Sequence, residues 1–489
     1  MNDQQNRPIP HDFFSDWKER EELAENMIPI IGRLYRKHNV ACYIYGRSLV
    51  NRSVIDIMKA HRAARQVERS ELSEFETWPV VQELAKLNLG PAHIDIGRIT
   101  SSYMADNRGL SIADYVREEV GDAADAPAKP LEQPQDVVLY GFGRIGRLIA
   151  RLLVEKAAGG DVLRLRAIVV RRGTAPSDIV KRASLLRRDS VHGSFKGTVR
   201  VLEDKEQLVV NGNVVQLIYA SNPAEIDYTQ YGINDAIIVD NTGAWSDEEG
   251  LSQHLKSKGV KKVLLTAPGK NGIKNIVVGV NHRDIQPEDK ILSAASCTTN
   301  AIVPPLKLLN DNFGIIRGHV ETVHAYTNDQ NLIDNYHKAD RRGRSAPMNM
   351  VLTSTGAAKA VAKALPELDG KLTGNAIRVP TPDVSMAILN LTLEKELTAE
   401  ELNDFVREAS LHSEVHRQID FTDSPEVVSS DIVGSRSACV FDAQATICNG
   451  NSAVVYLWYD NEFGYSCQVY RVLEKMAGVA YPVYPLGTP

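Results

Sequence analysis

The apolar residues of the first 120 positions recur at the spacing of an amphipathic helix. The first such stripe consists of Met27, Ile31, Leu34 and Tyr35. Ser53 and Asp56 have the spacing of a capping box at the start of a second helix. Pro79 is expected to interrupt the helical pattern that follows, because proline lacks the amide hydrogen that a helix interior needs. We therefore predict a mostly helical N-terminal extension over residues 1–120.

The segment GDAADAPAKPLEQPQD, residues 121–136, differs in composition from what precedes and follows it. It is rich in alanine, proline and acidic residues and contains almost nothing that a core could bury. Such a composition is typical of a linker between independently folded parts.

After the linker, short β-branched runs alternate with helical patterns, which predicts a parallel sheet with helical crossovers. We assign residues 137–296 to a Rossmann-type NAD(P)-binding domain, completed by a C-terminal helix over 461–480. From about Gly318 the apolar runs are longer and more widely spaced. Residues 297–460 are therefore expected to form an α+β catalytic domain with a mixed or antiparallel sheet.

Composition narrows the class of protein further. The 56 basic and 62 acidic side chains are nearly balanced, so global charge does not indicate a nucleic-acid partner or an anionic membrane. No apolar run reaches the roughly 18 residues that indicate a membrane span. The five cysteines are widely spaced and odd in number and show no metal-binding spacing. We expect a cytoplasmic protein with free thiols and no metal site.

The stretch GFGRIGR contains the G-x-G-x-x-G pattern at Gly141, Gly143 and Gly146. It follows an apolar strand and opens a helix, which is the context in which backbone amides bind a pyrophosphate. The alternative is a tight strand-to-helix turn that binds no ligand. The βα repeats downstream favour a dinucleotide.

The next strand, LRLRAIVV, lacks the acidic residue that usually follows it and binds the adenosine ribose. Arg171 stands at that point instead, followed by a second arginine. An arginine there suits the 2′-phosphate of NADP, although a solvated basic turn would look the same in sequence. The choice between NAD and NADP therefore stays open.

Cys297 stands at the junction between a strand-like segment and a helix start. A thiol at a helix N-terminus is expected to have a lowered pKa and to be nucleophilic. His324, on a later strand-like segment, is the candidate base. Taken alone, the cysteine could equally be inert packing and the histidine structural.

The order of several motifs decides between these readings, because the chain resembles the glyceraldehyde-3-phosphate dehydrogenase family from about Val137 to about Met476. The motifs that carry the resemblance are, in chain order, GFGRIGR, ASCTTN, HAYTNDQ, STGAAKA, RVPTP and WYDNEFGYS. The first 130 residues lie outside it.

The resemblance implies a role for each matching residue. Cys297 would be the nucleophile and His324 the base, with a thioester intermediate that inorganic phosphate cleaves. Residues implied to bind the substrate phosphate or inorganic phosphate are Ser296, Thr298, Thr327, Thr355, Gly356 and Arg378. Residues implied to bind NAD or NADP are Gly141, Gly143, Arg144, Ile145, Gly146, Thr242, Gly243, Thr266 and Asn461. Arg171 is added to them from its position after the second strand, where the family's usual acidic residue is missing.

The resemblance also implies a homotetramer, because the basic loop ADRRGRSAP matches one that reaches a neighbouring subunit. Glyceraldehyde 3-phosphate and inorganic phosphate are the expected substrates. Three alternatives remain: an erythrose-4-phosphate dehydrogenase, a thiol hydrolase, and a paralogue whose extension is a regulatory binding module. The extension's partner is not predictable from its sequence.

Overall fold

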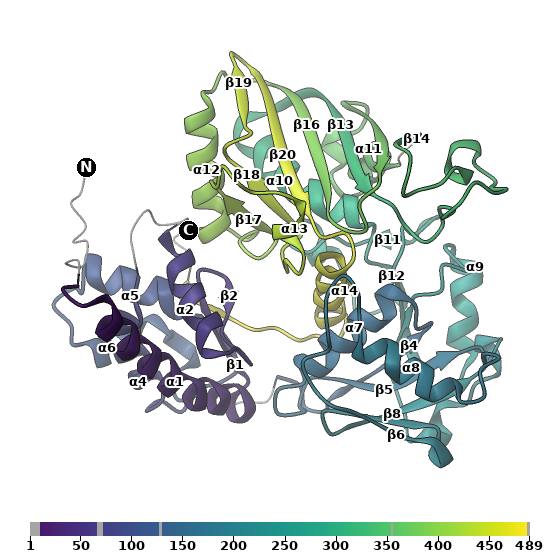
Figure 1. The fold of residues 1–489 in the computed structure, drawn as a ribbon, viewed down its shortest axis with the longest axis horizontal. Helices are drawn as coiled ribbons and strands as arrows, with labels where there is room; N and C mark the ends of the chain where they lie inside the picture. The colour runs from purple at the N-terminus through teal and green to yellow at the C-terminus, as the bar shows by residue number, and fades with distance from the viewer. Residues whose placement is uncertain (1–9, 66–71, 127–129, 354–355, 487–489) are drawn as a thin grey trace.

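The structure is a computed structural model that describes residues 10–65, 72–126, 130–353 and 356–486. Its three sheets form three lobes, which Figure 1 shows as the extension at the lower left, the first dehydrogenase lobe at the lower right and the second at the top. In the described ranges, no helix is both long and apolar enough to cross a membrane.

The N-terminal lobe is mostly helical around a small sheet of order β2-β1-β3-β21. Its core residues lie on each of its described α-helices and on the parallel strands β1, β3 and β21. Its elements are α1 (Phe13–His38), β1 (Val40–Ile44), β2 (Arg47–Ser48), α2 (Val54–Ala63), α4 (Glu74–Leu84), β3 (Ala92–Asp95), α5 (Ile96–Ala105), α6 (Ile112–Glu119) and, from the C-terminus of the chain, β21 (Val483–Tyr484).

The second lobe is a nine-stranded sheet of order β11-β12-β10-β9-β4-β5-β8-β7-β6, parallel except at β7 and β6. Apolar residues fill its strands, as burial on both faces requires. Its elements are β4 (Gln135–Tyr140), α7 (Arg144–Glu155), β5 (Leu163–Val170), α8 (Asp178–Arg187), β6 (Val199–Leu202), β7 (Gln207–Val210), β8 (Asn213–Tyr219), β9 (Ala236–Asp240), α9 (Glu248–Leu251), β10 (Val260–Leu265), β11 (Lys274–Asn275) and β12 (Ile291–Ser293).

The third lobe is a mixed sheet of order β14-β15-β13-β16-β20-β18-β17, with β19 beside β20. Helix α10 packs against β20 and β16. Its elements are α10 (Cys297–Phe313), β13 (Ile315–Ala325), β14 (Val351–Thr353), α11 (Ala357–Ala364), β15 (Leu372–Val379), β16 (Ser385–Leu393), α12 (Ala399–His412), β17 (Ile419–Thr422), α13 (Ser429–Ile432), β18 (Cys439–Asp442), β19 (Ile447–Asn449) and β20 (Ser452–Tyr459).

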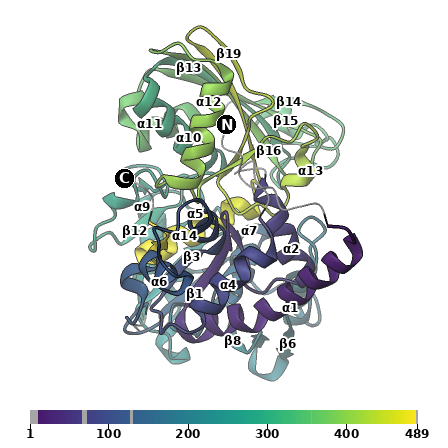
Figure 2. The ribbon, with the colours of Figure 1, turned by 90° about the vertical axis from the view of Figure 1, so that its left-hand side faces the viewer.

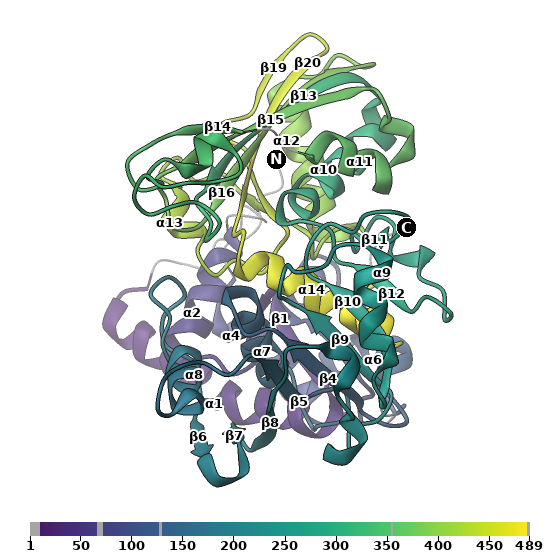
Figure 3. The ribbon, with the colours of Figure 1, turned by 90° about the vertical axis from the view of Figure 1, so that its right-hand side faces the viewer.

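Helix α14 (Phe463–Met476) lies between the lobes and is buried over most of its length. It packs against α7 of the second lobe and against α10 of the third. Figure 3 shows it crossing beneath the catalytic sheet, and Figure 2 shows it behind the extension's helices. The chain then returns to the N-terminal lobe, where β21 pairs in parallel with β3.

The fold class predicted from sequence is confirmed: a Rossmann-type lobe, a mixed-sheet catalytic lobe and a mostly helical extension. The capping box of α2 at Ser53 is present. The interruption predicted at Pro79 is wrong, because Pro79 lies inside α4, whose apolar face is buried in the lobe's core. Tertiary packing there outweighs the loss of one helical hydrogen bond. The boundaries assigned to the linker and the domains stay predictions.

Candidate active site

Cys297 is the first residue of α10 and follows a tightly held turn. Ala295, two residues earlier, has a φ of 56°, a left-handed conformation that is strained for a residue with a side chain. Two side chains hold this turn. The Tyr465 hydroxyl on α14 donates to the Ala295 carbonyl at 2.8 Å, and the Asn300 amide donates to the Ser296 carbonyl at 2.9 Å. The cysteine is thus placed at a rigid strand-to-helix joint.

The pairing of β13 with β15 brings the base and an arginine together. His324 and Arg378 are register partners across this parallel pair. The Sγ of Cys297 lies 3.5 Å from Nε2 of His324. On the far side of the ring, Nδ1 is 2.7 Å from the Ala325 carbonyl and 2.9 Å from Nη1 of Arg378. If Nδ1–H donates to that carbonyl, the lone pair of Nε2 faces the sulfur.

The ionisation of this pair differs from the expectation. Burial raises the pKa of the Cys297 thiol above its ordinary value, while the charge of Arg378 and hydrogen bonds from Thr298 act in the opposite direction. The predicted lowering of the thiol pKa is therefore wrong, because desolvation outweighs the helix terminus. Burial, together with Arg378, lowers the pKa of His324 to about 3. A neutral thiol thus faces a neutral imidazole that is free to accept its proton.

Arg378 and Thr327 form one side of a candidate anion site. Nη1 of Arg378 lies 3.4 Å from the Thr327 hydroxyl, which in turn donates to Asp329. Within the described ranges, Nε of Arg378 is buried with no hydrogen-bond partner. A buried guanidinium edge without a partner is costly unless an anion meets it, as the expected substrate phosphate would.

The other predicted phosphate ligands lie in less open surroundings. Ser296 caps α10 by accepting from the Thr299 amide at 3.0 Å. The hydroxyl of Thr298 is 3.0 Å from that of Tyr459. Gly356 is the N-cap of α11. Thr355 lies outside the described residues, so the structure does not place it.

Asn461 is held two residues before α14 begins. Its Oδ1 accepts from the Ser385 hydroxyl at 2.8 Å, and the same hydroxyl accepts from the Ala325 amide at 3.1 Å. Asn461 is thereby tied to the residue that follows His324. This short network connects the predicted nicotinamide ligand to the catalytic pair.

The glycine turn has the geometry that a pyrophosphate requires. Gly141 has a φ of 96°, and a Cβ on Gly146 would lie 2.6 Å from the Gly141 carbonyl. A Cβ on Gly143 would meet nothing within 4 Å, so open space lies beside the N-terminus of α7. The Arg144 side chain is bound to Asp189 at 2.5 Å and to Glu462. Its contribution to a nucleotide is therefore restricted to its backbone amide, next to that of Ile145.

A cavity of about 300 Å³ lies at the carboxyl ends of β4, β5, β8 and β9. Gly141, Gly143, Arg171 and Thr242 line it, together with Arg182, and its described lining contains two arginines and no carboxylate. Thr242, Gly243 and Thr266, which are also predicted ligands, lie at or beside this edge of the sheet. The Thr242 hydroxyl donates to the Asp240 carboxylate at 2.7 Å, and the Thr266 hydroxyl donates to the Asp240 carbonyl at 3.0 Å. Gly243 has a φ of 68°. The residues present fit a dinucleotide.

The sequence interpretation missed the residues that position the others. Tyr459 and Ser385 bond the predicted site residues Thr298 and Asn461, and Tyr465 bonds the backbone carbonyl two residues before Cys297. The two tyrosines flank Asn461 within the motif WYDNEFGYS. Their place in that motif was therefore a signal that could have identified them.

Comparison with known proteins identifies the family. The sequence model described as "Glyceraldehyde 3-phosphate dehydrogenase, NAD binding domain" matches residues 135–248, and the corresponding C-terminal domain matches residues 296–461. A "Glyceraldehyde-3-phosphate dehydrogenase 2" from Trichormus variabilis is 41% identical over 343 residues, covering 70% of this chain and 98% of that protein. The Zymomonas mobilis glyceraldehyde-3-phosphate dehydrogenase is 38% identical over the same length, with the same coverage of both chains.

A third relative includes the extension. The "Glyceraldehyde-3-phosphate dehydrogenase-like protein" of Pseudomonas aeruginosa strain UCBPP-PA14 is 62% identical over 461 residues, which covers 94% of this chain and all of that protein. An alignment of that length takes in most of the residues before β4. The extension is therefore not confined to this chain.

The fold and the matched domains define an oxidoreductase with an NAD-binding domain and a separate catalytic domain. The chain belongs to the glyceraldehyde-3-phosphate dehydrogenase family, and its extension of about 130 residues is absent from relatives that cover only 70% of it.

Proposed function

We propose that this chain is a phosphorylating dehydrogenase that oxidises glyceraldehyde 3-phosphate with NAD or NADP and inorganic phosphate to 1,3-bisphosphoglycerate. The observation that carries the proposal is the 3.5 Å approach of the Cys297 sulfur to Nε2 of His324 in a chain of this family. Arg378 lies behind the same imidazole, and its Nε, which has no partner among the described residues, is available for a substrate phosphate.

The chemistry begins with the sulfur of Cys297 bonding to the aldehyde carbon while the thiol proton passes to Nε2 of His324. The carbonyl oxygen becomes an oxyanion, which the backbone amide of Cys297 is oriented to stabilise as the first residue of α10. The imidazolium returns its proton to that oxygen. The product of this step is a thiohemiacetal on Cys297.

His324 then takes the hydroxyl proton of the thiohemiacetal as the carbon is oxidised. The nicotinamide, when bound, accepts the hydride that leaves this carbon. The remaining thioester on Cys297 is attacked by inorganic phosphate, which forms the acyl phosphate and releases the thiolate. The imidazolium of His324 supplies a proton to the departing sulfur or loses it to solvent.

We further propose that the enzyme accepts NADP. Arg171 lines the nucleotide cavity at the end of β5, where a carboxylate would select the ribose hydroxyls of NAD. The next arginine, Arg172, is unsuited to this role, because it pairs with Glu206 and lies over the Tyr219 ring. We therefore assign the preference for NADP over NAD to Arg171.

A homotetramer is proposed from the segment between β13 and β14. Its exposed apolar side chains are Leu332, Ile333, Tyr336, Met348 and Met350. Apolar exposure concentrated in one loop region indicates a protein interface. Light scattering of the purified protein should give four times the mass of the chain, and a monomer would refute this part of the proposal.

Steady-state kinetics test the proposed reaction. Glyceraldehyde 3-phosphate should be oxidised only when inorganic phosphate is present, with a higher kcat/KM for NADP than for NAD. Erythrose 4-phosphate is the matched alternative substrate. Turnover that does not depend on phosphate, or that occurs with erythrose 4-phosphate alone, would contradict the proposal.

A further inference from the structure

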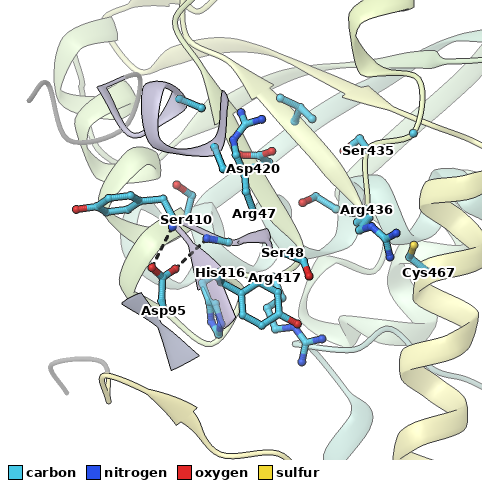
Figure 4. A pocket seen from close by; sticks show the side chains of 18 of the residues that line it. Arg47, Ser48, Asp95, Ser410, His416, Arg417, Asp420, Ser435, Arg436 and Cys467 are labelled. Carbon is cyan, nitrogen blue, oxygen red and sulfur yellow. Dashed lines mark hydrogen bonds between the residues drawn. The ribbon is translucent and has the colours of Figure 1, made fainter. Parts of the chain in front are cut away.

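A second cavity, of about 920 Å³, lies where the extension meets both dehydrogenase lobes and α14. Its volume is in the range of sites that bind small molecules. Figure 4 shows its labelled residues coming from the extension (Arg47, Ser48, Asp95), from the catalytic lobe (Arg417, Asp420) and from α14 (Cys467). It is distinct from the nucleotide cavity, because the two have no described lining residue in common.

Direct contacts between the extension and the rest of the chain hold the walls of this cavity together. The hydroxyl of Tyr35 donates to the Glu155 carbonyl at 3.1 Å, and the ring of His93 stacks on Tyr481 with centroids 4.9 Å apart. Strand β21 pairs with β3 directly beside these residues. The extension thus forms one wall of the cavity.

The described lining carries an excess of positive charge, with ten arginine or lysine side chains and seven carboxylates. Several of the carboxylates are already engaged. Glu155 pairs with Arg436 at 2.6 Å, and Asp95 accepts the amides of Tyr45 and Gly46. Glu474 is a buried carboxylate that partly offsets the cations.

Arg417 is the centre of the unbalanced charge. It makes no hydrogen bond or ion pair with any part of the chain that the structure describes, although it is half-buried. The pKa of Lys156 is lowered to about 8 and that of Arg471 to about 10, mainly by burial; the charge of Arg417 acts in the same direction and Glu474 in the opposite one. Burial and Arg417 likewise lower the pKa of His416 to about 4.

Three other cations around the cavity also have no anionic partner among the described residues. Lys156 has no ion pair in the described ranges, and its ammonium lies 4.1 Å from the centre of the Tyr470 ring. Nε of Arg471 and Nε of Arg98 are buried without a hydrogen-bond partner among the described residues. Like charges crowded together without counter-ions destabilise a fold, so such clusters indicate a site for an anion.

We propose that this cavity binds a small organic phosphate that carries at least two negative charges. Arginine forks suit phosphate oxygens, and Lys156 supplies a compact charge. Tyr43, Tyr481 and His93 provide aromatic surface for the organic part. The extension is then the element that completes a ligand site which the dehydrogenase lobes alone do not form.

Calorimetric titration of the full chain with pyrophosphate, ADP and ribose 5-phosphate tests the proposal without any activity assay. Wild-type protein should bind at least one of these probes, and Arg417→Met and Lys156→Met should each weaken that binding tenfold or more. Arg200→Met removes an exposed arginine on β6 and should leave it unchanged. Tighter binding of ADP than of ribose 5-phosphate would identify a nucleotide as the ligand, and the reverse order a sugar phosphate.

Thermal melts separate ligand binding from a structural role. Because Arg417 has no partner in the described structure, Arg417→Met should melt at or above the wild-type temperature without ligand, and it should lose the stabilisation that the bound probe gives. A lower melting temperature without ligand would instead indicate a structural arginine and overturn the proposal. A failure of all three probes to bind would also overturn the proposal. Binding that is lost in Arg378→Lys but kept in Arg417→Met would overturn it as well, because the bound phosphate would then lie in the catalytic site.

Discussion

Replacing His324 by asparagine isolates the contribution of the base. In the structure, Nε2 of His324 is 3.5 Å from the sulfur of Cys297 and has a free lone pair when Nδ1–H donates to the Ala325 carbonyl. Asparagine keeps a polar side chain on β13 but has no basic nitrogen. The variant must therefore react through the Cys297 thiolate that forms by ionisation in solvent, without a general base.

The magnitude follows from the ionisation of the pair. Burial raises the pKa of the Cys297 thiol above its ordinary value, so near neutral pH the unaided thiolate is a small minority of the thiol. General-base catalysis contributes about 10²- to 10⁴-fold, which corresponds to about 3–5 kcal/mol in the barrier. We expect His324→Asn to form the thioester more slowly than the wild type by a factor within that range.

The pH profile gives the sharper readout. Wild-type enzyme should show a flat kcat/KM from about pH 6 to pH 8, because the imidazole, with a pKa of about 3, is already neutral and the thiol is still protonated. In His324→Asn the rate should rise about tenfold per pH unit over the same interval, following the thiolate. Rapid-mixing measurements of reduced nicotinamide, without phosphate, report this single step.

His319→Asn is the matched control, because His319 lies on the same strand but its side chain is 44% exposed and bonds Thr373. It should leave the rate and the pH profile unchanged. A loss of less than tenfold in His324→Asn, or a pH profile parallel to that of the wild type, would refute the assignment of His324 as the base.

Three further perturbations test other parts of the account. Arg171→Glu should lower the NADP-to-NAD ratio of kcat/KM at least tenfold, and an unchanged ratio would contradict the role given to this arginine. Burial alone would lower the pKa of His192, but the carboxylates of Asp383 and Asp460 raise it to about 10. The protonated His192 therefore stabilises the fold fully below its ordinary pKa of 6.5, and this stabilisation is lost as the pH rises towards 10. In urea unfolding, His192→Gln should lose less stability between pH 7 and pH 10 than the wild type, and equal losses would contradict the stabilising role of His192. Tyr465→Phe removes the bond to the carbonyl before Cys297 and should cost about 1 kcal/mol in unfolding free energy and lower kcat, and an unchanged thermal melt would show that this bond does not hold the turn.

The parts of the fold that could be predicted have local signals. The βα repeats identified the nucleotide-binding lobe from the period of their apolar residues, and the capping box at Ser53 marked the start of α2. The strands of the extension could not be predicted in this way. Strands β1 and β3 are short, and their sheet is completed by β21, about 390 residues later in the chain.

The candidate site shows the same division. Sequence named Cys297 and His324, and the structure places them together. The sequence could not give the direction in which the thiol pKa shifts, because that shift depends on burial by elements far apart in the chain. It also depends on Arg378, which the register of β13 and β15 brings next to the imidazole. The dipole argument considered only the helix on which the cysteine lies.

The most direct test of the central claim is the mass of the intact protein after one turnover without inorganic phosphate. Wild-type enzyme mixed with glyceraldehyde 3-phosphate and NADP should gain the mass of a phosphoglyceroyl group on Cys297, and added phosphate should remove it. Cys297→Ser should gain nothing. An acyl group on another residue, or turnover that leaves Cys297 unmodified, would contradict the account.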